Sequence, residues 1–428
     1  MSFKYTEIGK IPVEWDVKMI QEIGEVVGGG TPKTKEDSYW DGNISWITPK
    51  DLSSFTERYI EVGERSITEL GLKNSSAKLL PKGTVLFSSR APIGYLAIAR
   101  KELCTNQGFK NIVCDKKYSS NEFLFYMLKA KKNEIESIAG GSTFKEVSGK
   151  VVKEFKIPIP PLNEQKAIAH ILSTLDDKIE VNKQINKTLE NMAEAIFKQW
   201  FVDFEFPNED GEPYKSSGGE MVESELGMIP KGWGVKELRE IIDIIKQGTK
   251  PGEHLKDRKY NPIDTLPMKS IAINDFKPYE EAKSSLILFE KYDILIGAMR
   301  VYFHRVNLAP YKGITRTTTF VLRSKRIQDV PYNLFLLNMD ETIDYAERTS
   351  KGSTMPYAVW DNGMSNMLTA YSNKELRNNF FEITQPMLET IMKRSAENEV
   401  LIKLRDSILP KLMSGKIRVP LDSKGEAS

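Results

Sequence analysis

The sequence predicts an α+β protein in which two globular domains are separated by a pair of long antiparallel coiled-coil helices, with an internal pseudo-twofold repeat. EIGKIPVEWDVK at residues 7–18 returns as ELGMIPKGWGVK at residues 225–236, an offset of 218 (225 − 7). Two long segments have apolar residues at helical spacing. Between them lie short apolar runs and glycine-rich loops, which are typical of strands in a mixed fold.

The composition is that of an ordinary globular protein. The chain has 428 residues, of which 40% are hydrophobic and 28% charged, with a net charge of +2. No run of about 18 apolar residues occurs, and the N-terminal segment lacks the apolar core of a signal peptide. We therefore expect no membrane span and a cytoplasmic location. Cys104 and Cys114 fit that compartment as reduced thiols.

The domain limits follow from the repeat and from composition. Between residues 208 and 225 six acidic residues stand against one lysine, and large apolar residues are few, which predicts a linker. The expected order is a first domain at 1–160, a central long helix at 161–205, a linker at 206–224, a second domain at 225–373, and a distal long helix with a tail at 374–428.

The two domains keep a common frame. KGTVLFSSRAPIGYLAIAR at 82–100 predicts two strands around a turn, and KYDILIGAMRVYFHRVNLA at 291–309 is a loose copy. Arg90 and Arg300 are expected at the same place, just after the first strand. The segments that precede these strands have diverged. Two copies of a domain that share their strands and differ in their loops are typical of domains that recognise different targets.

Each half ends in a long helix with an apolar seam. A helix of about 40 residues is about 60 Å long and needs a partner, which is either the other helix or its own domain. Asparagines in the seam would fix the register of the pair. The predicted seam consists of Leu172, Leu175, Ile179, Asn182, Asn186, Leu189, Ile196 and Trp200 in the first helix, and of Met387, Ile391, Asn398, Leu401, Ile408 and Leu412 in the second.

Apolar residues outside this seam suggest that a further helix docks on the pair. They are Ile168, Ile185, Met192 and Phe197.

Basic residues gather in the second domain. Residues 291–326 contain eight Lys or Arg against one acid, Asp293. Such cations suit phosphates, while polar side chains at base edges carry sequence specificity. The candidate DNA-binding residues are Thr31, Lys33, Lys35, Trp46, Lys50, Arg90, Ser142, Thr143 and Lys145 in the first domain, and Lys250, His254, Arg300, Arg305, Arg316, Lys351, Ser353, Thr354 and Tyr357 in the second.

The residues offer no catalytic centre and no metal site. His170, His254 and His304 are far apart, and no zinc-binding spacing of His, Cys or Glu occurs. GGGTPKT at 28–34 lacks the GK[ST] ending of a phosphate loop. No NPP[YF] segment for adenine methylation is present.

Four segments resemble the specificity subunits of type I restriction–modification systems. They are GGGTPKTKEDSYWDGNISWITPKDL at 28–52, GSTFKEV at 141–147, FKIPIPPLNEQKAIAHILSTLDDKIE at 155–180 and LRDSILPKLMSGKIRV at 404–419. The resemblance covers nearly the whole chain. It implies two target-recognition domains, each reading one half of a bipartite site in double-stranded DNA, with the helix pair setting the spacer.

The resemblance also implies partners. Two methyltransferase subunits would dock around the helices and methylate adenine at N6, and motor–nuclease subunits would cleave unmodified DNA. S-adenosylmethionine, ATP and Mg²⁺ would then be bound by these partners, with no cofactor in this chain. Three alternatives remain: the specificity chain of a related system with a fused methyltransferase–nuclease, a scaffold that binds only proteins, and a free-standing enzyme.

Overall fold

The computed structural model describes residues 2–53, 55–90, 92–140 and 145–419. The chain forms two compact units. Unit 1 comprises Met1–Glu180 and Leu401–Ser428, and unit 2 comprises Val181–Val400. Each unit therefore holds a globular domain together with part of each long helix.

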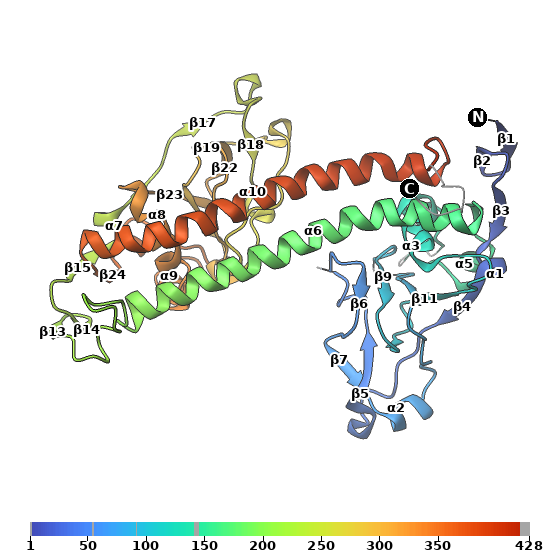
Figure 1. Cartoon of the computed structure of the whole chain (residues 1–428), viewed down its shortest axis with the longest axis horizontal. Coiled ribbons are helices and arrows are strands. Elements are labelled where there is room, and N and C mark those ends of the chain that lie inside the picture. The colour runs from blue at the N-terminus through green and yellow to red at the C-terminus, as the bar shows by residue number, and fades with distance from the viewer. Residues whose placement is uncertain (1, 54, 91, 141–144, 420–428) are drawn as a thin grey trace. The chain divides into compact units, whose positions relative to one another are not determined.

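The two long helices are antiparallel, as predicted. Helix α6 (Leu162–Phe197) continues into a π-helical segment, η2 (Lys198–Val202), and α10 spans Lys374–Met413 (Figure 1). Within unit 2, Asn182 Nδ2 donates to Asn398 Oδ1 at 2.9 Å, while the rings of Trp200 and Phe380 lie 6.0 Å apart. Residue numbers thus rise along α6 as they fall along α10.

None of the predicted seam residues is exposed. Leu172, Ile179, Asn182, Asn186, Trp200, Ile391, Asn398 and Leu412 are buried. Leu175, Leu189, Ile196, Met387, Leu401 and Ile408 are half-buried. Trp200 lies beyond α6, in η2.

Each long helix packs on the other long helix and also on its own domain. Both packing alternatives are therefore realised at once. Ile168 belongs to the core of unit 1 and Phe197 to the core of unit 2. The prediction that these two side chains await a partner helix is therefore wrong, because domain cores already cover them. Ile185 is half-buried, and Met192 remains 47% exposed.

A polar network crosses the helix pair in unit 2. Arg394 Nη1 donates to Asn182 Oδ1 at 2.7 Å, and Asn186 Nδ2 donates to Ser395 Oγ at 3.3 Å. The halves of the pair correspond at an offset of 212 (394 − 182; 398 − 186). Asn182 and Arg394 are therefore equivalent residues that contact each other, which places this contact on the pseudo-twofold axis of the helix pair. Polar groups in such a seam fix register.

The domain of unit 1 consists of small sheets. The five-stranded sheet has the order β4-β11-β8-β9-β6 and the three-stranded sheet the order β10-β5-β7, while β1–β2 and β3–β12 are pairs. The strands are β1 (Phe3–Thr6), β2 (Gly9–Pro12), β3 (Asp16–Met19), β4 (Gly24–Gly28), β5 (Trp40–Ile47), β6 (Tyr59–Ile60), β7 (Arg65–Ile67), β8 (Val85–Phe87), β9 (Leu96–Ala99), β10 (Cys104–Thr105), β11 (Lys110–Cys114) and β12 (Lys156–Ile159).

The domain of unit 2 repeats the beginning of this order. Phe3 pairs with Pro12 in the first hairpin, and Met221 pairs with Pro230 in its copy. Two four-stranded sheets follow, with orders β16-β23-β20-β21 and β17-β19-β22-β18, and β15 pairs with β24. The strands are β13 (Met221–Ser224), β14 (Gly227–Pro230), β15 (Gly234–Glu237), β16 (Ile242–Ile244), β17 (Gly248–Thr249), β18 (Lys259–Tyr260), β19 (Leu286–Phe289), β20 (Ile294–Gly297), β21 (Val306–Leu308), β22 (Gly313–Arg316), β23 (Thr319–Ser324) and β24 (Leu368–Tyr371).

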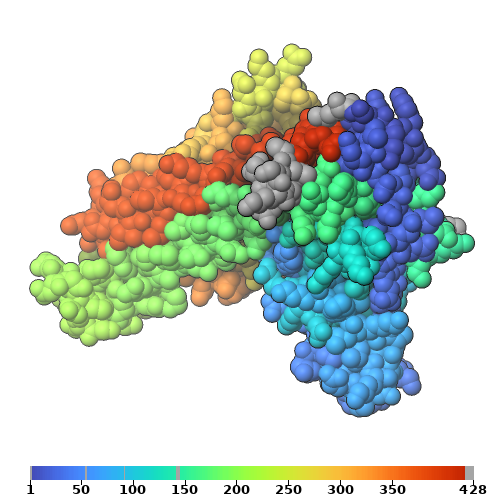
Figure 2. Space-filling view, turned by 45° about the vertical axis from the view of Figure 1, so that its right-hand side comes forward, coloured from blue at the N-terminus to red at the C-terminus, as the bar shows by residue number. Residues whose placement is uncertain are grey.

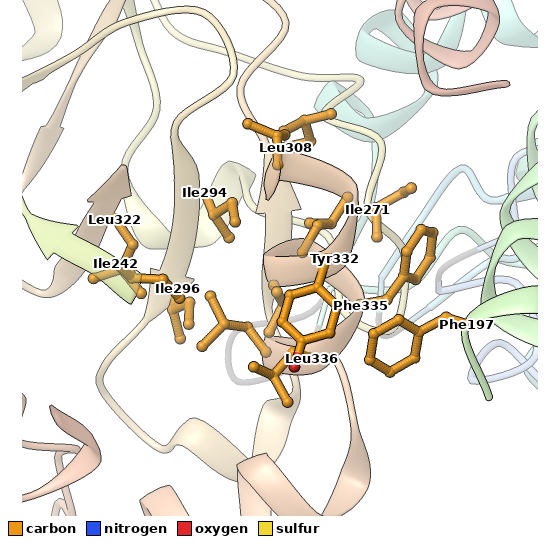
Figure 3. Packing of buried hydrophobic residues seen from close by; sticks show 14 of the residues in the cluster. Phe197, Ile242, Ile271, Ile294, Ile296, Leu308, Leu322, Tyr332, Phe335 and Leu336 are labelled. Carbon is orange, nitrogen blue, oxygen red and sulfur yellow. The ribbon is translucent and has the colours of Figure 1, made fainter. Parts of the chain in front are cut away.

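Short helices pack on each domain core, and some of them also reach the long helices. In unit 2, Tyr332 and Phe335 of α8 face Phe197 at the end of α6, beside the isoleucines of β20 (Figure 3). The short helices are α1 (Ile20–Ile23), α2 (Glu69–Lys73), α3 (Asn121–Ala130), α4 (Lys132–Ser137) and α5 (Gly149–Glu154) in unit 1, and α7 (Leu238–Ile241), α8 (Val330–Leu337) and α9 (Asp340–Arg348) in unit 2.

Polar contacts add to this packing. In unit 1, Asp176 of α6 accepts hydrogen bonds from Tyr126 Oη and from Arg405 Nη1 of α10, both at 2.6 Å. Arg418, which follows α10, donates to Glu14 at 3.1 Å, so the red end of α10 meets the dark-blue N-terminal segment in Figure 2. In unit 2, Glu399 of α10 pairs with Lys259 of β18. Each domain is thereby tied to its part of the helix pair.

The segment predicted as a linker, residues 206–224, packs on unit 2. The ring of Phe206 stacks on Tyr214 at 4.5 Å and on Trp233 at 5.6 Å. The Tyr214 hydroxyl donates to the carbonyl of Glu220 at 2.8 Å, and β13 begins at Met221. This connection between α6 and the second domain is therefore ordered.

Candidate nucleic-acid interface

In both units a hairpin closes on the turn that follows the central core strand. In unit 1 the amide of Val147 donates to Ser89 O at 2.9 Å, and in unit 2 the amide of Ala358 donates to Ala298 O at 2.8 Å. One residue further along, the backbone of Arg90 forms an isolated antiparallel β-bridge with Glu146, and that of Met299 forms one with Tyr357. The register thus equates Arg90 with Met299. The prediction that Arg90 and Arg300 share one place is wrong by one residue, because the strands that lead into the two turns already align Ser89 with Ala298.

This hairpin gathers several predicted DNA-binding residues of unit 2. Lys351 and Tyr357 exchange backbone hydrogen bonds, each of 2.9 Å, and the Arg300 amide donates to Pro356 O at 2.8 Å. All three side chains are exposed, as are Ser353 and Thr354 at the tip of the hairpin. The structure therefore brings Arg300, Lys351 and Tyr357 together on one surface.

A second group lies on the four-stranded sheet of β17, β19, β22 and β18. Thr249 of β17 pairs with Leu286 of β19, which pairs with Arg316 of β22. The exposed His254 ring shares a hydrogen bond of 3.0 Å with Thr249 Oγ1. Lys250 follows directly on β17 and is exposed. Lys250, His254 and Arg316 are thus carried by neighbouring strands and the turn after β17.

Ion pairs sort the basic stretch at 291–326 into two classes. Four cations are neutralised by acids of unit 2: Lys291 by Glu389, Arg323 by Asp293, Lys325 by Asp243 and Arg326 by Asp329. Arg300, Arg305, Lys312 and Arg316 have no ion pair among the described residues. Since a phosphate competes poorly with a bound carboxylate, the second class is the better candidate for DNA.

The cations of unit 1 divide in the same way. Lys33, Lys35 and Lys145 are exposed and form no ion pair within the described part of the chain. Lys50 contacts Glu64 at 2.7 Å, and that hydrogen bond raises the pKa of the Lys50 ammonium. Arg90 lies 3.8 Å from Glu146, at half-exposure. Thr31 is half-buried, with its hydroxyl on Gln107.

The structure contradicts one expectation about this surface and narrows another. Trp46 is only 5% exposed, and its Nε1 donates to Gly30 O at 2.9 Å, so the ring serves the core instead of DNA. Arg305 is half-buried, and its Nε donates to Leu266 O at 3.0 Å, which leaves part of the guanidinium committed to the fold. Ser142 and Thr143 lie outside the described residues.

The glycine-rich loop at 28–34 has a packing role. A Cβ at Gly29 would lie 1.9 Å from Asn106 O, and one at Gly30 would lie 2.3 Å from the backbone of Ser76. Only glycine permits so close an approach of two backbones. The loop therefore needs its glycines for packing, whether or not an anion is present.

Sequence reasoning missed four exposed apolar side chains beside Arg300. Tyr302 is 44% and Phe303 36% exposed, and Met268 and Met355 project from neighbouring loops. Aromatic residues interleaved with cations are a signal for nucleic-acid contact, and RVYFHR at 300–305 carries it.

Other kinds of site find no support in the described residues. No three His, Cys, Asp or Glu side chains there are grouped closely enough to hold a metal ion. Cys104 and Cys114 are free thiols, and burial raises the pKa of each to about 12. Within 2–53, 55–90, 92–140 and 145–419, no helix is both long and apolar enough for a membrane span.

Comparison with known proteins identifies relatives along the whole chain. A family profile described as "Type I restriction modification DNA specificity domain" matches residues 12–191. The type I restriction enzyme MjaIX specificity subunit of Methanocaldococcus jannaschii is 37% identical over 97% of this chain and 96% of its own length. The EcoR124I/EcoR124II specificity subunit of Escherichia coli is 31% identical over 41% of this chain and 43% of its own.

A solved structure has the same fold. The crystal structure of the type I restriction–modification S subunit from M. genitalium aligns with a TM-score of 0.59, over 96% of this chain and 99% of that one, at 17% identity. The duplicated domains and the antiparallel helix pair are thus the architecture of a known fold. Together with the relative that matches along nearly the entire length, this establishes that the chain belongs to the family of type I restriction–modification specificity subunits.

Proposed function

We propose that this chain recognises a bipartite DNA sequence for a type I restriction–modification complex, with the domain of unit 1 reading one half-site and the domain of unit 2 the other. One observation carries the proposal: the same hairpin-on-turn frame recurs in both units, yet it presents different side chains. Arg90 and Lys145 stand on the frame of unit 1, and Arg300, Lys351 and Tyr357 on that of unit 2.

The helix pair would set the distance between the two half-sites. Its antiparallel register is held by the polar network around Asn182 and Arg394. In unit 1 the domain is held to its part of the pair by contacts such as the hydrogen bond of 2.6 Å from Tyr126 Oη to Asp176 of α6. A fixed register between the two helices is what a spacer-measuring element requires.

Catalysis would belong to other subunits. Specificity subunits are the non-catalytic members of type I systems, so this chain is not an enzyme. We propose that two methyltransferase subunits and motor–nuclease subunits join it in the cytoplasm and bind S-adenosylmethionine, ATP and Mg²⁺. The exposed Met192 and the half-buried Ile185 of α6 are candidate contacts for a methyltransferase helix.

A binding experiment with the assembled methyltransferase complex tests the proposal. The complex should bind a duplex that carries both half-sites, and scrambling either half should weaken binding. The logarithm of the affinity should fall linearly with the logarithm of salt concentration, since phosphate contacts release counterions. Equal binding to unrelated duplexes, or none at all, would contradict DNA recognition and favour a scaffold that binds only proteins.

A further inference from the structure

One turn of unit 2 has an unusual backbone. Arg300 and His304 have φ angles of 49° and 52°, in the left-handed region, and they flank the 3-10 turn Val301–Phe303. Residues with a Cβ seldom adopt this conformation, because the side chain crowds the backbone. Such strain persists only where neighbouring contacts impose it, and it gathers at functional positions.

Three contacts impose this conformation. Val301 is buried in the core of unit 2. The buried His304 ring places Nε2 2.9 Å from the carbonyl of Asn338. The Arg300 amide donates to Pro356 O of the neighbouring hairpin at 2.8 Å. The turn is therefore held from beneath and from one side, and the two residues that follow the buried Val301 are carried outward.

Tyr302 and Phe303 are those outward residues. Their ring centroids lie 5.0 Å apart, and neither side chain packs against a hydrophobic cluster of the described core. Exposed Met355 and Tyr357 stand on the hairpin that closes on the turn, and Met268 stands on an adjoining loop. A group of exposed apolar side chains that the fold does not use marks an interaction surface.

The charge around these rings suits a polyanion. The Arg305 guanidinium lies 4.9 Å from the centre of the Phe303 ring, and the amide of Lys269 donates to His304 O at 2.8 Å. Lys269, Arg300 and Lys351 are exposed and form no ion pair among the described residues. Asp340, at the start of α9, lies 3.4 Å from His304 Nδ1. Exposed cations thus stand beside the rings and are available to phosphates.

From this geometry we infer that Tyr302 and Phe303 form an aromatic wedge, which inserts at a base step of the duplex half-site read by unit 2. This inference rests on the proposed function. Lys269 and Lys351 would hold the phosphates beside the step, and the rings would stack on bases that the insertion partly separates. Wedges of apolar side chains unstack base steps in this way, and stacking on an aromatic ring tolerates any base.

The turn of unit 1 has no counterpart to the wedge. In unit 1 the Ser88 amide donates to Tyr95 O at 2.9 Å, and in unit 2 the Gly297 amide donates to Arg305 O at 3.0 Å. The residues between them are SRAPIG in unit 1 and AMRVYFH in unit 2, so the aromatic pair belongs to the longer turn. Any effect of the wedge should accordingly be confined to one half-site.

The test uses the full chain in its methyltransferase complex and a duplex with 2-aminopurine placed at successive positions of both half-sites. The half-sites are first identified by mapping methylated adenines. The wild-type complex should change the fluorescence at one step of the unit 2 half-site only. The double variant Tyr302→Ala/Phe303→Ala should remove that signal and weaken binding roughly ten- to a hundred-fold, with an unchanged salt slope.

Two variants complete the design. Phe303→Trp, with Tyr302 intact, should keep the signal because it keeps a stacking surface. Tyr118→Ala removes a comparably exposed aromatic side chain from unit 1 and should leave binding and fluorescence at wild-type values. Matching thermal unfolding curves show that the variants are folded, as expected for side chains outside the core.

The outcomes separate the inference from the proposed function. If the double variant binds and unstacks DNA like the wild type, the wedge is refuted while DNA recognition stands. If it instead loses its methyltransferase subunits at unchanged intrinsic DNA affinity, the surface belongs to a protein partner, and the wedge is again refuted. If the wild-type complex shows no preference for the mapped half-sites, the proposed function itself fails and the wedge with it.

Discussion

Replacing Arg394 with alanine should destabilise the centre of the helix pair. Arg394 Nη1 donates to Asn182 Oδ1 at 2.7 Å, and Asn182 is 0% exposed. The substitution leaves a buried amide oxygen without this donor, and water reaches such a position only at a cost. Asn182 and Arg394 are equivalent under the pseudo-twofold repeat. The substitution therefore acts at the point where the pseudo-twofold axis passes between α6 and α10.

The expected cost is about 1 to 2 kcal/mol. Leaving one buried polar atom unpaired costs roughly 1–3 kcal/mol. Against this, Arg394 Nε is itself buried without a partner among the described residues, and its removal relieves part of that penalty. The Asn182 amide keeps its bond of 2.9 Å to Asn398 Oδ1, so the network is weakened and not lost.

Hydrogen exchange measured by mass spectrometry is the assay, because it reports the opening of α6 and α10 separately from the rest of the chain. Peptides covering 181–190 and 386–400 should exchange faster in Arg394→Ala. The neighbouring exposed residue gives a control, Lys393→Ala, for which a change within about 0.5 kcal/mol is expected. Equal exchange in both variants would refute the network. In a double-mutant cycle with Asn182→Ala, the double variant should lose less unfolding free energy than the sum of the losses of the two single variants.

Three further predictions concern spacing, recognition and pH. Four residues inserted beside Asn186 lengthen α6 by about 6 Å. Methylation mapping should then find a changed spacer between unchanged half-sites, and an unchanged spacer would contradict the claim that the helix pair sets the spacer length. Arg300→Ala should weaken or relax only one half-site, by about 1–3 kcal/mol if it contacts guanine; equal loss at both halves, or none, would show that Arg300 reads no base. Burial raises the pKa of Glu190 despite its bond of 2.8 Å from the Ile271 amide. The folded state therefore holds that proton more tightly, and the stability Glu190 supplies at low pH is lost as pH rises through its folded pKa. Glu190→Gln should remove this dependence, so that its unfolding midpoint gains on the wild type as pH rises above the ordinary glutamate pKa of about 4.3; parallel curves for the two proteins would contradict the assignment.

The sequence predicted the repeat and the helix pair because both rest on periodic patterns. The matching hairpins Phe3–Pro12 and 221–230 agree with the repeat, because the same offset relates them. The helical seam follows from apolar spacing of three and four residues. The buried or half-buried state of all the predicted seam positions shows how strongly that spacing constrains a helix that must be covered along its length. The domain limits drawn from composition stay a prediction, since the compact units divide both helices.

The candidate site was less predictable because it depends on register and on partners distant in sequence. Trp46 was a candidate DNA-binding residue, but its indole Nε1 donates to Gly30 O, 16 residues earlier in the chain. Half of the cations at 291–326 proved to be neutralised by acids such as Asp243 and Glu389, which no local pattern reveals. Ile168 and Phe197 occupied positions outside the seam because a helix beside a domain has a second face to bury.

The most direct test of the central claim is a genome-wide map of N6-methyladenine. A host expressing this chain with its methyltransferase is compared with a strain that lacks only this chain. The account predicts that one split motif with a fixed gap is methylated in the first strain and unmethylated in the second. Methylation of that motif in both strains, or of none in either, would contradict the claim that this chain selects the DNA sequence.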